Sequence, residues 1–148
     1  MEPLDELEFC REIVEQAPDG IIVASVEGKI LLWNDQAHAI FGYSRQEVLG
    51  QSLDVIIPSE LREAHWRGFN RAVADGRTAS FGLAMITKSV HKTGRKIYVD
   101  LSFGVLKSST GQVTGALAFA RDATQRYSAQ KALRAELNNL KKQLPMQD

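Results

Sequence analysis

Residues 28–52 read GKILLWNDQAHAIFGYSRQEVLGQS, and this stretch carries the local signals that decide the fold. Gly28 is suited to a tight turn, and the apolar run at 30–33 after it has the composition of a short strand. Asn34 is a preferred helix N-cap residue, and apolar residues follow it at helical spacing over 35–42. The first half of the stretch therefore predicts a turn, a strand and a capped helix in direct succession.

The second half of the stretch predicts another short helix. Gly42 is placed to end the first helix, because glycine readily adopts the left-handed conformation that follows many helix C-termini. Ser44 and Glu47 have the spacing of a capping box, which predicts a helix over 45–49. Each junction in the stretch thus has a physical cause.

The remaining elements follow from apolar periodicity and from turn residues. Apolar residues at steps of three and four predict an amphipathic helix over 4–17. The other predicted elements are a strand over 21–25, a helix over 60–75 and strands over 79–90, 95–106 and 112–121. Short turns separate the last three strands, which predicts a meander. In the middle one of these strands apolar and polar residues alternate, and this pattern indicates one buried face.

The chain beyond residue 124 is predicted to be a helix with a narrow apolar stripe. Its leucines have the spacing of alternating core positions in a coiled coil, and they are Leu133, Leu137, Leu140 and Leu144. These few apolar steps do not sustain an isolated coiled coil. We therefore expect this helix to need the domain, or the N-terminal helix of a second copy, beside it.

The composition indicates a soluble chain with one domain. The chain has 148 residues, enough to bury a stable core without disulfides or structural metal ions. Its 18 basic and 18 acidic residues cancel, so we expect neither nucleic acid nor a membrane surface as a partner. No apolar run has transmembrane length, and the acidic N-terminus is unlike a signal peptide. The single cysteine, Cys10, leaves no disulfide framework and fits a cytoplasmic location.

These motifs resemble those of the PAS family of sensory modules. The resembling residues are Asn34, the runs Phe41-Gly42-Tyr43-Ser44 and Glu47-Val48-Leu49-Gly50, and the C-terminal run Arg121-Asp122-Ala123-Thr124. The resemblance implies an α+β PAS fold, in which a five-stranded antiparallel sheet has helices on one face. The predicted order of two strands, a helical crossover and three more strands matches that fold.

The resemblance also divides the chain into three parts. We predict an N-terminal amphipathic helix at 1–17, a PAS domain at 18–124 and a C-terminal signalling or coiled-coil helix at 125–148. In the family's pattern Asp122 and Thr124 tie the last strand to the outgoing helix, so the resemblance implies that signals are coupled there. Because both terminal helices are amphipathic, we expect them to hold a homodimer.

The sequence shows no pattern typical of catalysis or of flavin photochemistry. It has no glycine-rich phosphate loop, no nucleophile elbow and no Cys/His group with zinc spacing, so we expect no enzyme. The PAS relatives called LOV domains need a cysteine between the short helices and the long one. Here residues 51–61 read QSLDVIIPSEL, so no LOV-type flavin photochemistry is expected. A signalling function would then act through a downstream signalling protein or effector domain.

Residues 57–71, IPSELREAHWRGFNR, contain the main candidate for a cofactor ligand. Helical spacing from Leu61 places His65 on the apolar side of the long helix. His65 stands where the haem-binding PAS domains of bacterial oxygen-sensor kinases, and of a related phosphodiesterase, have their proximal ligand. The resemblance implies haem b with His65 as its iron ligand, and Arg71 as the partner of a propionate. In many PAS domains without haem, a similar histidine only makes local hydrogen bonds.

Three more residues extend the resemblance to a haem pocket. Leu101 and Phe103 are implied to face the porphyrin. Met85 stands where the oxygen sensors carry a distal arginine, and its thioether is a candidate sixth ligand of the iron. The alternative for Met85 is an ordinary packing role in the core.

Other aromatic and histidine side chains are predicted to lie in solvent. His38 falls on the polar side of its helix, and His91 comes just before a hairpin turn. Trp66 follows His65 and is predicted to lie on the exposed side of the long helix. None of the three is therefore expected to bind a ligand.

The leading hypothesis is a cytoplasmic PAS sensory module that couples a pocket event to its C-terminal helix, with haem b as the specific cofactor. One alternative is a ligand-free interaction or dimerisation module, whose interior is filled by Phe81, Met85, Phe103 and Phe119. Another is a sensor for an organic acid or an aromatic metabolite. The colour of the purified protein separates the haem hypothesis from the other two.

Overall fold

The computed structural model describes residues 5–78 and 85–144. In chain order the elements are α1 (Glu6–Gln16), β1 (Gly20–Ser25), β2 (Ile30–Trp33), α2 (Asp35–Phe41), α3 (Arg45–Val48), the 3-10 turns η1 (Leu53–Ile56) and η2 (Ser59–Leu61), α4 (Arg62–Asp75), β3 (Met85–Val90), β4 (Lys96–Lys107), β5 (Val113–Asp122) and α5 (Thr124–Gln143). The predicted elements agree closely with these bounds. The part of the third predicted strand at 79–84, with Phe81, lies outside the described residues.

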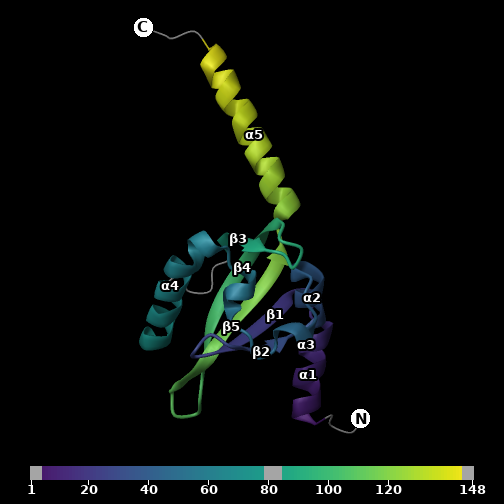
Figure 1. Cartoon of the computed structure of the whole chain (residues 1–148), viewed down its shortest axis with the longest axis vertical. Helices are drawn as coiled ribbons and strands as arrows, with labels where there is room; N and C mark the ends of the chain where they lie inside the picture. The colour runs from purple at the N-terminus through teal and green to yellow at the C-terminus, as the bar shows by residue number, and fades with distance from the viewer. Residues whose placement is uncertain (1–4, 79–84, 145–148) are drawn as a thin grey trace.

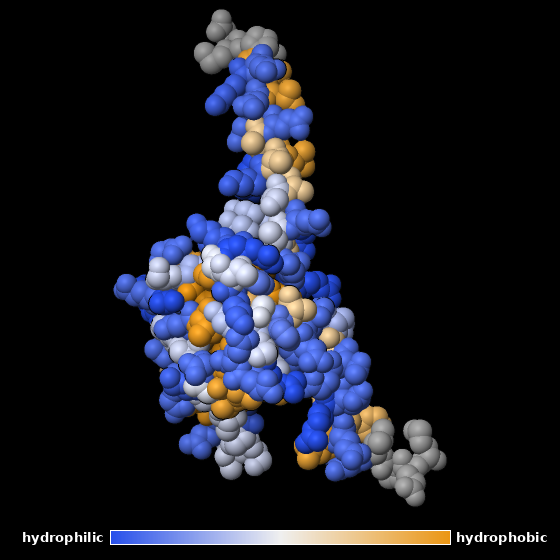
Figure 2. Space-filling view, turned by 45° about the vertical axis from the view of Figure 1, so that its right-hand side comes forward, coloured by the Kyte–Doolittle hydropathy of each residue, from blue (hydrophilic) through white to orange (hydrophobic). Residues whose placement is uncertain are grey.

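The described strands form a five-stranded sheet in the order β2-β1-β5-β4-β3, and every neighbouring pair is antiparallel. The predicted α+β class, the five-stranded antiparallel sheet and the chain order of two strands, helices and three strands are therefore confirmed. Figure 1 shows α2, α3 and α4 gathered around the sheet, while α5 leaves it as a single rod and α1 extends toward the other end of the molecule. In Figure 2 a hydrophobic stripe runs along one side of α5.

The core lies between β1, β2, β4 and the short helices. Its largest fully buried side chains include Trp33, Phe41 and Val99. The Trp33 and Phe41 rings are 5.4 Å apart, and Trp33 Nε1 donates a hydrogen bond to the Tyr43 carbonyl oxygen at 3.0 Å. Gly42 ends α2 with φ 86°, the left-handed conformation that the sequence predicted.

Asn34 joins four segments through its buried amide. Its Oδ1 accepts hydrogen bonds from the backbone N–H groups of Ile21 at 2.8 Å and Ala37 at 3.0 Å. Its Nδ2 donates to the carbonyl oxygens of Val14 at 2.8 Å and Asp19 at 3.1 Å. Asn34 therefore caps α2, as predicted, and also fixes the end of α1 to the start of β1.

The turn between β3 and β4 is held against the short helices. Lys92 pairs with the Glu47 carboxylate through its side chain, and its backbone N–H donates to the Phe41 carbonyl oxygen at 2.9 Å. Glu47 also completes the capping box with Ser44, so the prediction for α3 is confirmed. The hydrogen bond from Lys92, and next the one from the Ser44 backbone, lower the pKa of Glu47 to about 2.

The depressed pKa makes a prediction about stability in acid. A carboxylate whose pKa falls on folding stabilises the native state above its unfolded pKa of 4.5, and that contribution is lost as the pH drops toward 2. Glu47→Gln is therefore expected to lower the urea midpoint above pH 4.5, with the difference from wild type closing near pH 2. Glu63→Gln, on the exposed surface of α4, is the control and is expected to change little at any pH. A constant difference for Glu47→Gln across this pH range would contradict the assignment.

Candidate functional site

A cavity of about 470 Å³ lies between α4 and the sheet, within the size range of small-molecule sites. Most of its wall is apolar, and the larger apolar residues on it are Ile22, Leu53, Ile56, Ile57, Leu61, Phe69, Val73, Met85, Leu101, Phe103, Val105 and Leu117. Its polar residues are His65, Lys88 and a group of hydroxyl side chains that includes Thr87 and Ser89. The wall is suited to an apolar ligand with a few polar groups.

Side chains do not fill the cavity, because small residues face each other across it. The register of the sheet puts Ala116 and Ala118 of β5 opposite Val105 and Phe103 on the inner face. On the other side α4 presents Ala64, Gly68 and Ala72 to the cavity. Short side chains on both walls leave space that larger ones would fill.

The inner position of the alanines corrects the prediction for Phe119. Side chains alternate along a strand, so Phe119 lies on the outer face when Ala118 and Ala120 face inward. Its side chain is exposed and is not part of the cavity wall. The sequence alternation could not show which face of β5 is inside, because apolar residues occupy both.

α4 covers the cavity and is held mainly by its N-terminal half. None of its residues, all of which the structure describes, is buried. Trp66 Nε1 donates a hydrogen bond to Asp54 Oδ1 at 2.8 Å, and Arg62 donates to two carbonyl oxygens of the η1 segment. The Trp66 ring also packs on Gly28, where a Cβ atom would come within 2.2 Å of it. These contacts attach α4 to the η1 segment and to the β1–β2 turn.

The prediction that Trp66 lies on the exposed side of α4 is therefore wrong. The side of α4 that faces the protein lies against the β1–β2 turn as well as over the cavity. The contact joins residues 28 and 66. Glycine at position 28 adopts the φ of +83° in the turn, and its lack of a Cβ atom leaves room for the Trp66 ring. Helical periodicity alone does not reveal such a long-range contact.

His65 is the polar side chain of α4 that the cavity wall contains. Its Nδ1 atom is buried, and no described residue hydrogen-bonds to it. Its ring lies edge-on to Trp66, with centroids 4.7 Å apart. Burial lowers the pKa of His65, and the negative charge of Asp54 partly opposes this change. The imidazole is therefore neutral near pH 7 and has an unsatisfied ring nitrogen.

The other residues predicted to bind haem occupy different positions. Leu101 and Phe103 line the cavity, as expected from the alternation in β4. Met85 also lines it and pairs with Leu101 in the sheet, but 52% of its surface is exposed. Arg71 is exposed and is not part of the wall, so its contact with a propionate stays a prediction.

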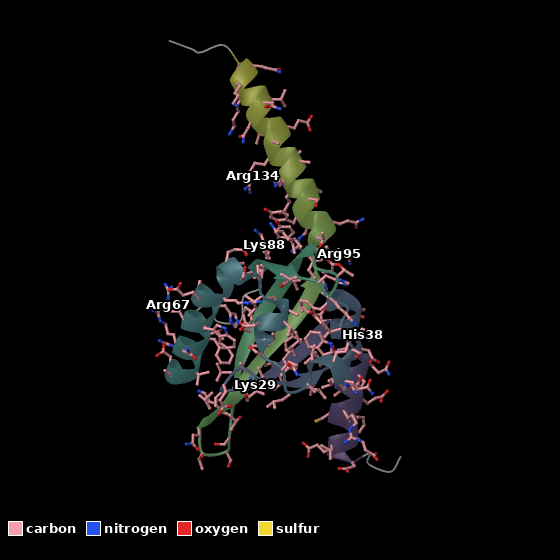
Figure 3. All side chains as sticks on the ribbon, in the orientation of Figure 1. Lys29, His38, Arg67, Lys88, Arg95 and Arg134 are labelled. Atoms are coloured by element: carbon pink, nitrogen blue, oxygen red, sulfur yellow. The ribbon has the colours of Figure 1, made fainter. Side chains whose placement is uncertain are left out.

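Charged side chains lie outside the cavity in the part of the chain that the structure describes. Lys88 borders it but is paired with Tyr98, while its neighbours Thr87 and Ser89 take the inner face of β3. Alternation then directs the Lys88 side chain to the outer face, and Figure 3 shows it near the base of α5. Arg67 points away from the sheet in the same figure.

Of the remaining histidines, His38 lies in solvent as predicted, whereas His91 is half-buried with its ring close to Gly42. His38 is exposed on α2, on the side away from the cavity, as Figure 3 shows. His91 precedes the β3–β4 turn, where its Nδ1 accepts a hydrogen bond from the Thr93 backbone N–H at 3.1 Å. Neither borders the cavity.

The first turn of α5 is fixed to the end of the sheet through Asp122 and Thr124. Asp122 Oδ1 accepts hydrogen bonds from the Thr124 backbone N–H at 2.9 Å and from Thr124 Oγ1 at 2.7 Å. Thr124 Oγ1 in turn accepts one from the Tyr98 N–H at 3.1 Å. The N-cap residue itself is Ala123, so Asp122 acts one residue before the cap.

Two further contacts hold α5 against β4. The rings of Tyr98 and Tyr127 are stacked, with centroids 3.7 Å apart and planes 15° from parallel. Arg126 pairs with Asp100 at 2.9 Å. No local pattern in the sequence predicts these contacts, because they join residues far apart in the chain. β4 thus borders the cavity through Leu101. It contacts α5 through Tyr98 and Asp100, whose side chains alternate with that of Leu101 along the strand.

We expect Asp122→Ala to loosen α5 without unfolding the domain. The substitution removes two hydrogen bonds at the first turn of the helix, and loss of such a terminal contact costs about 1 kcal/mol. Amide exchange should increase in residues 125–144 and stay unchanged in the sheet. An equal loss of protection across β1 and β5 would show instead that Asp122 supports the whole domain.

The comparisons with known proteins agree with this arrangement. The family model described as PAS fold matches residues 8–123. The PAS domain of a protein from Colwellia psychrerythraea has a similar fold, with a TM-score of 0.71 and 23% identity over 82% of this chain and 99% of that one. The described part of the chain contains no helix with the length and apolar character to cross a membrane.

Two curated relatives are sensors. The chain is 29% identical to the oxygen sensor protein DosP of Escherichia coli over 75% of its own length and 14% of that protein. It is 28% identical to the sensor protein FixL of Bradyrhizobium diazoefficiens over 83% of its length and 24% of that protein. The chain therefore corresponds to a small part of each of these longer proteins.

Proposed function

This chain belongs to the PAS fold family, and from that premise we propose that it is a sensory module in which an event in the cavity under α4 changes the position of α5. The observation that carries the proposal is the double contact of β4. Leu101 and Phe103 border the cavity, whereas Tyr98 and Asp100 hold the first turns of α5. A shift of this strand therefore acts on both sites at once.

We propose haem b as the specific occupant of the cavity. The wall is apolar, and His65 offers a neutral imidazole with a buried nitrogen that no described residue satisfies. Neutral imidazole is a common ligand of haem iron. Bound through His65, haem would supply an iron centre that responds to a diatomic gas or to a change of redox state. The relative named as an oxygen sensor protein, DosP, supports this choice.

In this proposal each residue at the cavity has a distinct role. His65 would hold the iron, and Leu101 with Phe103 would pack on the ring and exclude water. Met85 borders the same cavity from β3 and is the candidate for a sixth ligand. Its partial exposure leaves the thioether free to approach or leave the cavity, which would suit an exchangeable ligand.

A second candidate is an uncharged organic molecule. The described residues of the wall direct no carboxylate, lysine or arginine side chain into the cavity, whereas Thr87, Ser89 and His65 supply hydrogen-bonding groups. Such a wall would suit an aromatic or aliphatic molecule with one or two polar atoms better than an organic acid. The sheet and α5 would respond in the same way.

Titration of the purified chain with haem tests the first candidate. A saturable Soret band at one haem per chain is expected if haem b binds in the cavity. Ala118→Phe is the matched variant, because it fills the inner face of β5 while leaving His65 in place. Loss of the band in this variant supports binding inside the cavity. A wild-type chain without a saturable band excludes haem, and a thermal-shift screen of uncharged aromatic molecules then tests the second candidate.

We also propose that the chain works as a cytoplasmic homodimer without enzymatic activity of its own. The exposed apolar side chains of α1 and α5 support a dimer, because large exposed apolar surfaces are usually covered by a partner. The small share of DosP and FixL that the chain covers supports action on an effector domain or a separate signalling protein. If no ligand binds, the alternative is a ligand-free interaction module that acts through its dimer surfaces alone.

Sedimentation of the intact chain at micromolar concentration is expected to give a dimer. The matched control is residues 18–124, which lack both terminal helices and are expected to sediment as a monomer. A monomeric intact chain would contradict the proposal. A dimeric truncated chain would place the contact on the domain instead.

A further inference from the structure

The two terminal helices expose apolar side chains at opposite ends of the molecule. On α1 the exposed side chains include Leu7 and Ile13, at 63% and 64% of their surface. On α5 the four leucines of the stripe are each at least half exposed, up to 68% for Leu144. Figures 1 and 2 show that α1 and α5 extend away from each other, so they do not meet within one chain.

The two helices also carry opposite charges. Residues 5–16 contain five acidic side chains and one basic one, a net charge of −4. Residues 124–143 contain five basic side chains and one acidic one, a net charge of +4. Pairing α1 with α1, or α5 with α5, would therefore bring like charges together, whereas pairing α1 with α5 brings opposite charges together.

The charges are also placed at matching ends. The acidic Glu6 and Glu8 lie in the first turn of α1, and the basic Lys141 and Lys142 lie in the last turn of α5. The α5 end is far from its own domain and the α1 end points away from it, as Figure 1 shows. In an antiparallel pair of α1 and α5, the acidic end would lie beside the basic end. The two helix dipoles would then point in opposite directions, which is the favourable arrangement for neighbouring helices.

A groove beside α1 has room for the leucine stripe. It measures about 380 Å³ and lies between α1 and the β2 and α3 segments. Its apolar residues include Leu7, Val14, Leu31 and Leu49. Leu31 and Leu49 are themselves exposed, so the groove continues the apolar surface of α1 onto the domain.

We infer that α5 of one copy packs antiparallel against α1 of a second copy, with its leucine stripe in the groove beside that α1. Two-fold symmetry then makes the same contact twice, once at each end of the dimer. The inference rests on the dimer proposed above and specifies its contact. In this arrangement each α5 is held at its base by its own domain and along its length by the partner's α1.

Disulfide trapping tests the contact, because Cys10 lies on α1 in the groove and is the only cysteine of the chain. Single cysteines are introduced in α5 by Leu133→Cys, Leu137→Cys or Leu140→Cys, and the dimer is mildly oxidised. At least one variant is expected to give a covalent dimer in which mass spectrometry finds Cys10 joined to the introduced cysteine. Ala135→Cys, which falls outside the leucine stripe, is the matched control and is expected to give much less of this product.

The other outcomes separate this inference from the proposed dimer. Links only between two introduced cysteines would indicate paired α5 helices, and links only between two Cys10 residues would indicate paired α1 helices. Either result, or a dimer with no Cys10 link to α5 in any of the three variants, overturns the inference and leaves the dimer standing. A monomeric wild-type chain overturns both.

Charge reversal gives a second, independent measurement. Glu6→Lys with Glu8→Lys is expected to weaken the dimer about tenfold, a size consistent with the loss of four weak exposed ion pairs, two in each of the symmetric contacts. Lys141→Glu with Lys142→Glu should weaken it similarly. The combination of all four changes should restore the affinity, and the absence of restoration would contradict the proposed pairing of the helix ends.

Discussion

Asn34→Ala is expected to lower the free energy of unfolding by about 3–5 kcal/mol. The amide is almost fully buried and makes four hydrogen bonds, two as acceptor and two as donor. Alanine leaves two N–H groups and two carbonyl oxygens without their partner. Domains of this kind are stable by only about 5–15 kcal/mol, so the variant would be marginally folded.

Urea unfolding followed by circular dichroism measures this loss, and two variants serve as controls. Ser44→Ala removes an N-cap that is not buried, so it should cost only about 1 kcal/mol. Asn34→Asp keeps the acceptor but turns an oxygen toward the carbonyl oxygens of Val14 and Asp19, so it should cost at least as much as Asn34→Ala and release α1 in amide exchange. If Asn34→Ala costs no more than Ser44→Ala, the buried network does not hold the segments together as described.

His65→Ala is expected to abolish haem binding if haem b occupies the cavity. His65 is the histidine that borders the cavity, whereas His38 is exposed on α2 and His91 sits at the β3–β4 turn. The Soret band should disappear in His65→Ala and remain in His38→Ala and His91→Ala. A wild-type band that survives in His65→Ala would show that another group holds the iron.

Variants of Met85 separate its two possible functions. Met85→Leu keeps the apolar volume and removes the thioether. If the sulfur ligates the iron, the ferrous spectrum should change from six-coordinate to five-coordinate. An unchanged spectrum would mean that Met85 only packs at the rim of the cavity, and Leu101→Ala would then be expected to perturb the haem more strongly than Met85→Leu.

The local signals in the sequence predicted much of the fold. Asn34 and the Ser44–Glu47 pair act within three residues, so their capping functions could be recognised without knowing the fold. The meander could be predicted as well, because turn residues separate alternating strands. His65 was placed on the cavity side by helical spacing alone, which is again a local property.

The contacts that the sequence did not reveal are those between distant segments. Trp66 meets Gly28 and Asp54, and Tyr98 meets Tyr127, in each case across a long stretch of chain. The second hydrogen-bonding task of Asn34, which fixes α1, is also of this kind. Such contacts depend on how the elements pack, which periodicity and capping do not specify.

Among the described residues of its own chain, α5 is attached at its base, and this attachment has a mechanical consequence. A helix of 20 residues is about 30 Å long, and the contacts with Asp122, Tyr98 and Asp100 all act on its first turn. It is therefore a lever, and a tilt of about 10° at the base moves the far end by about 5 Å, close to one helical turn. A rotation small enough to leave the core packing intact is thus amplified along the lever into a displacement as large as the repeat of the helix itself.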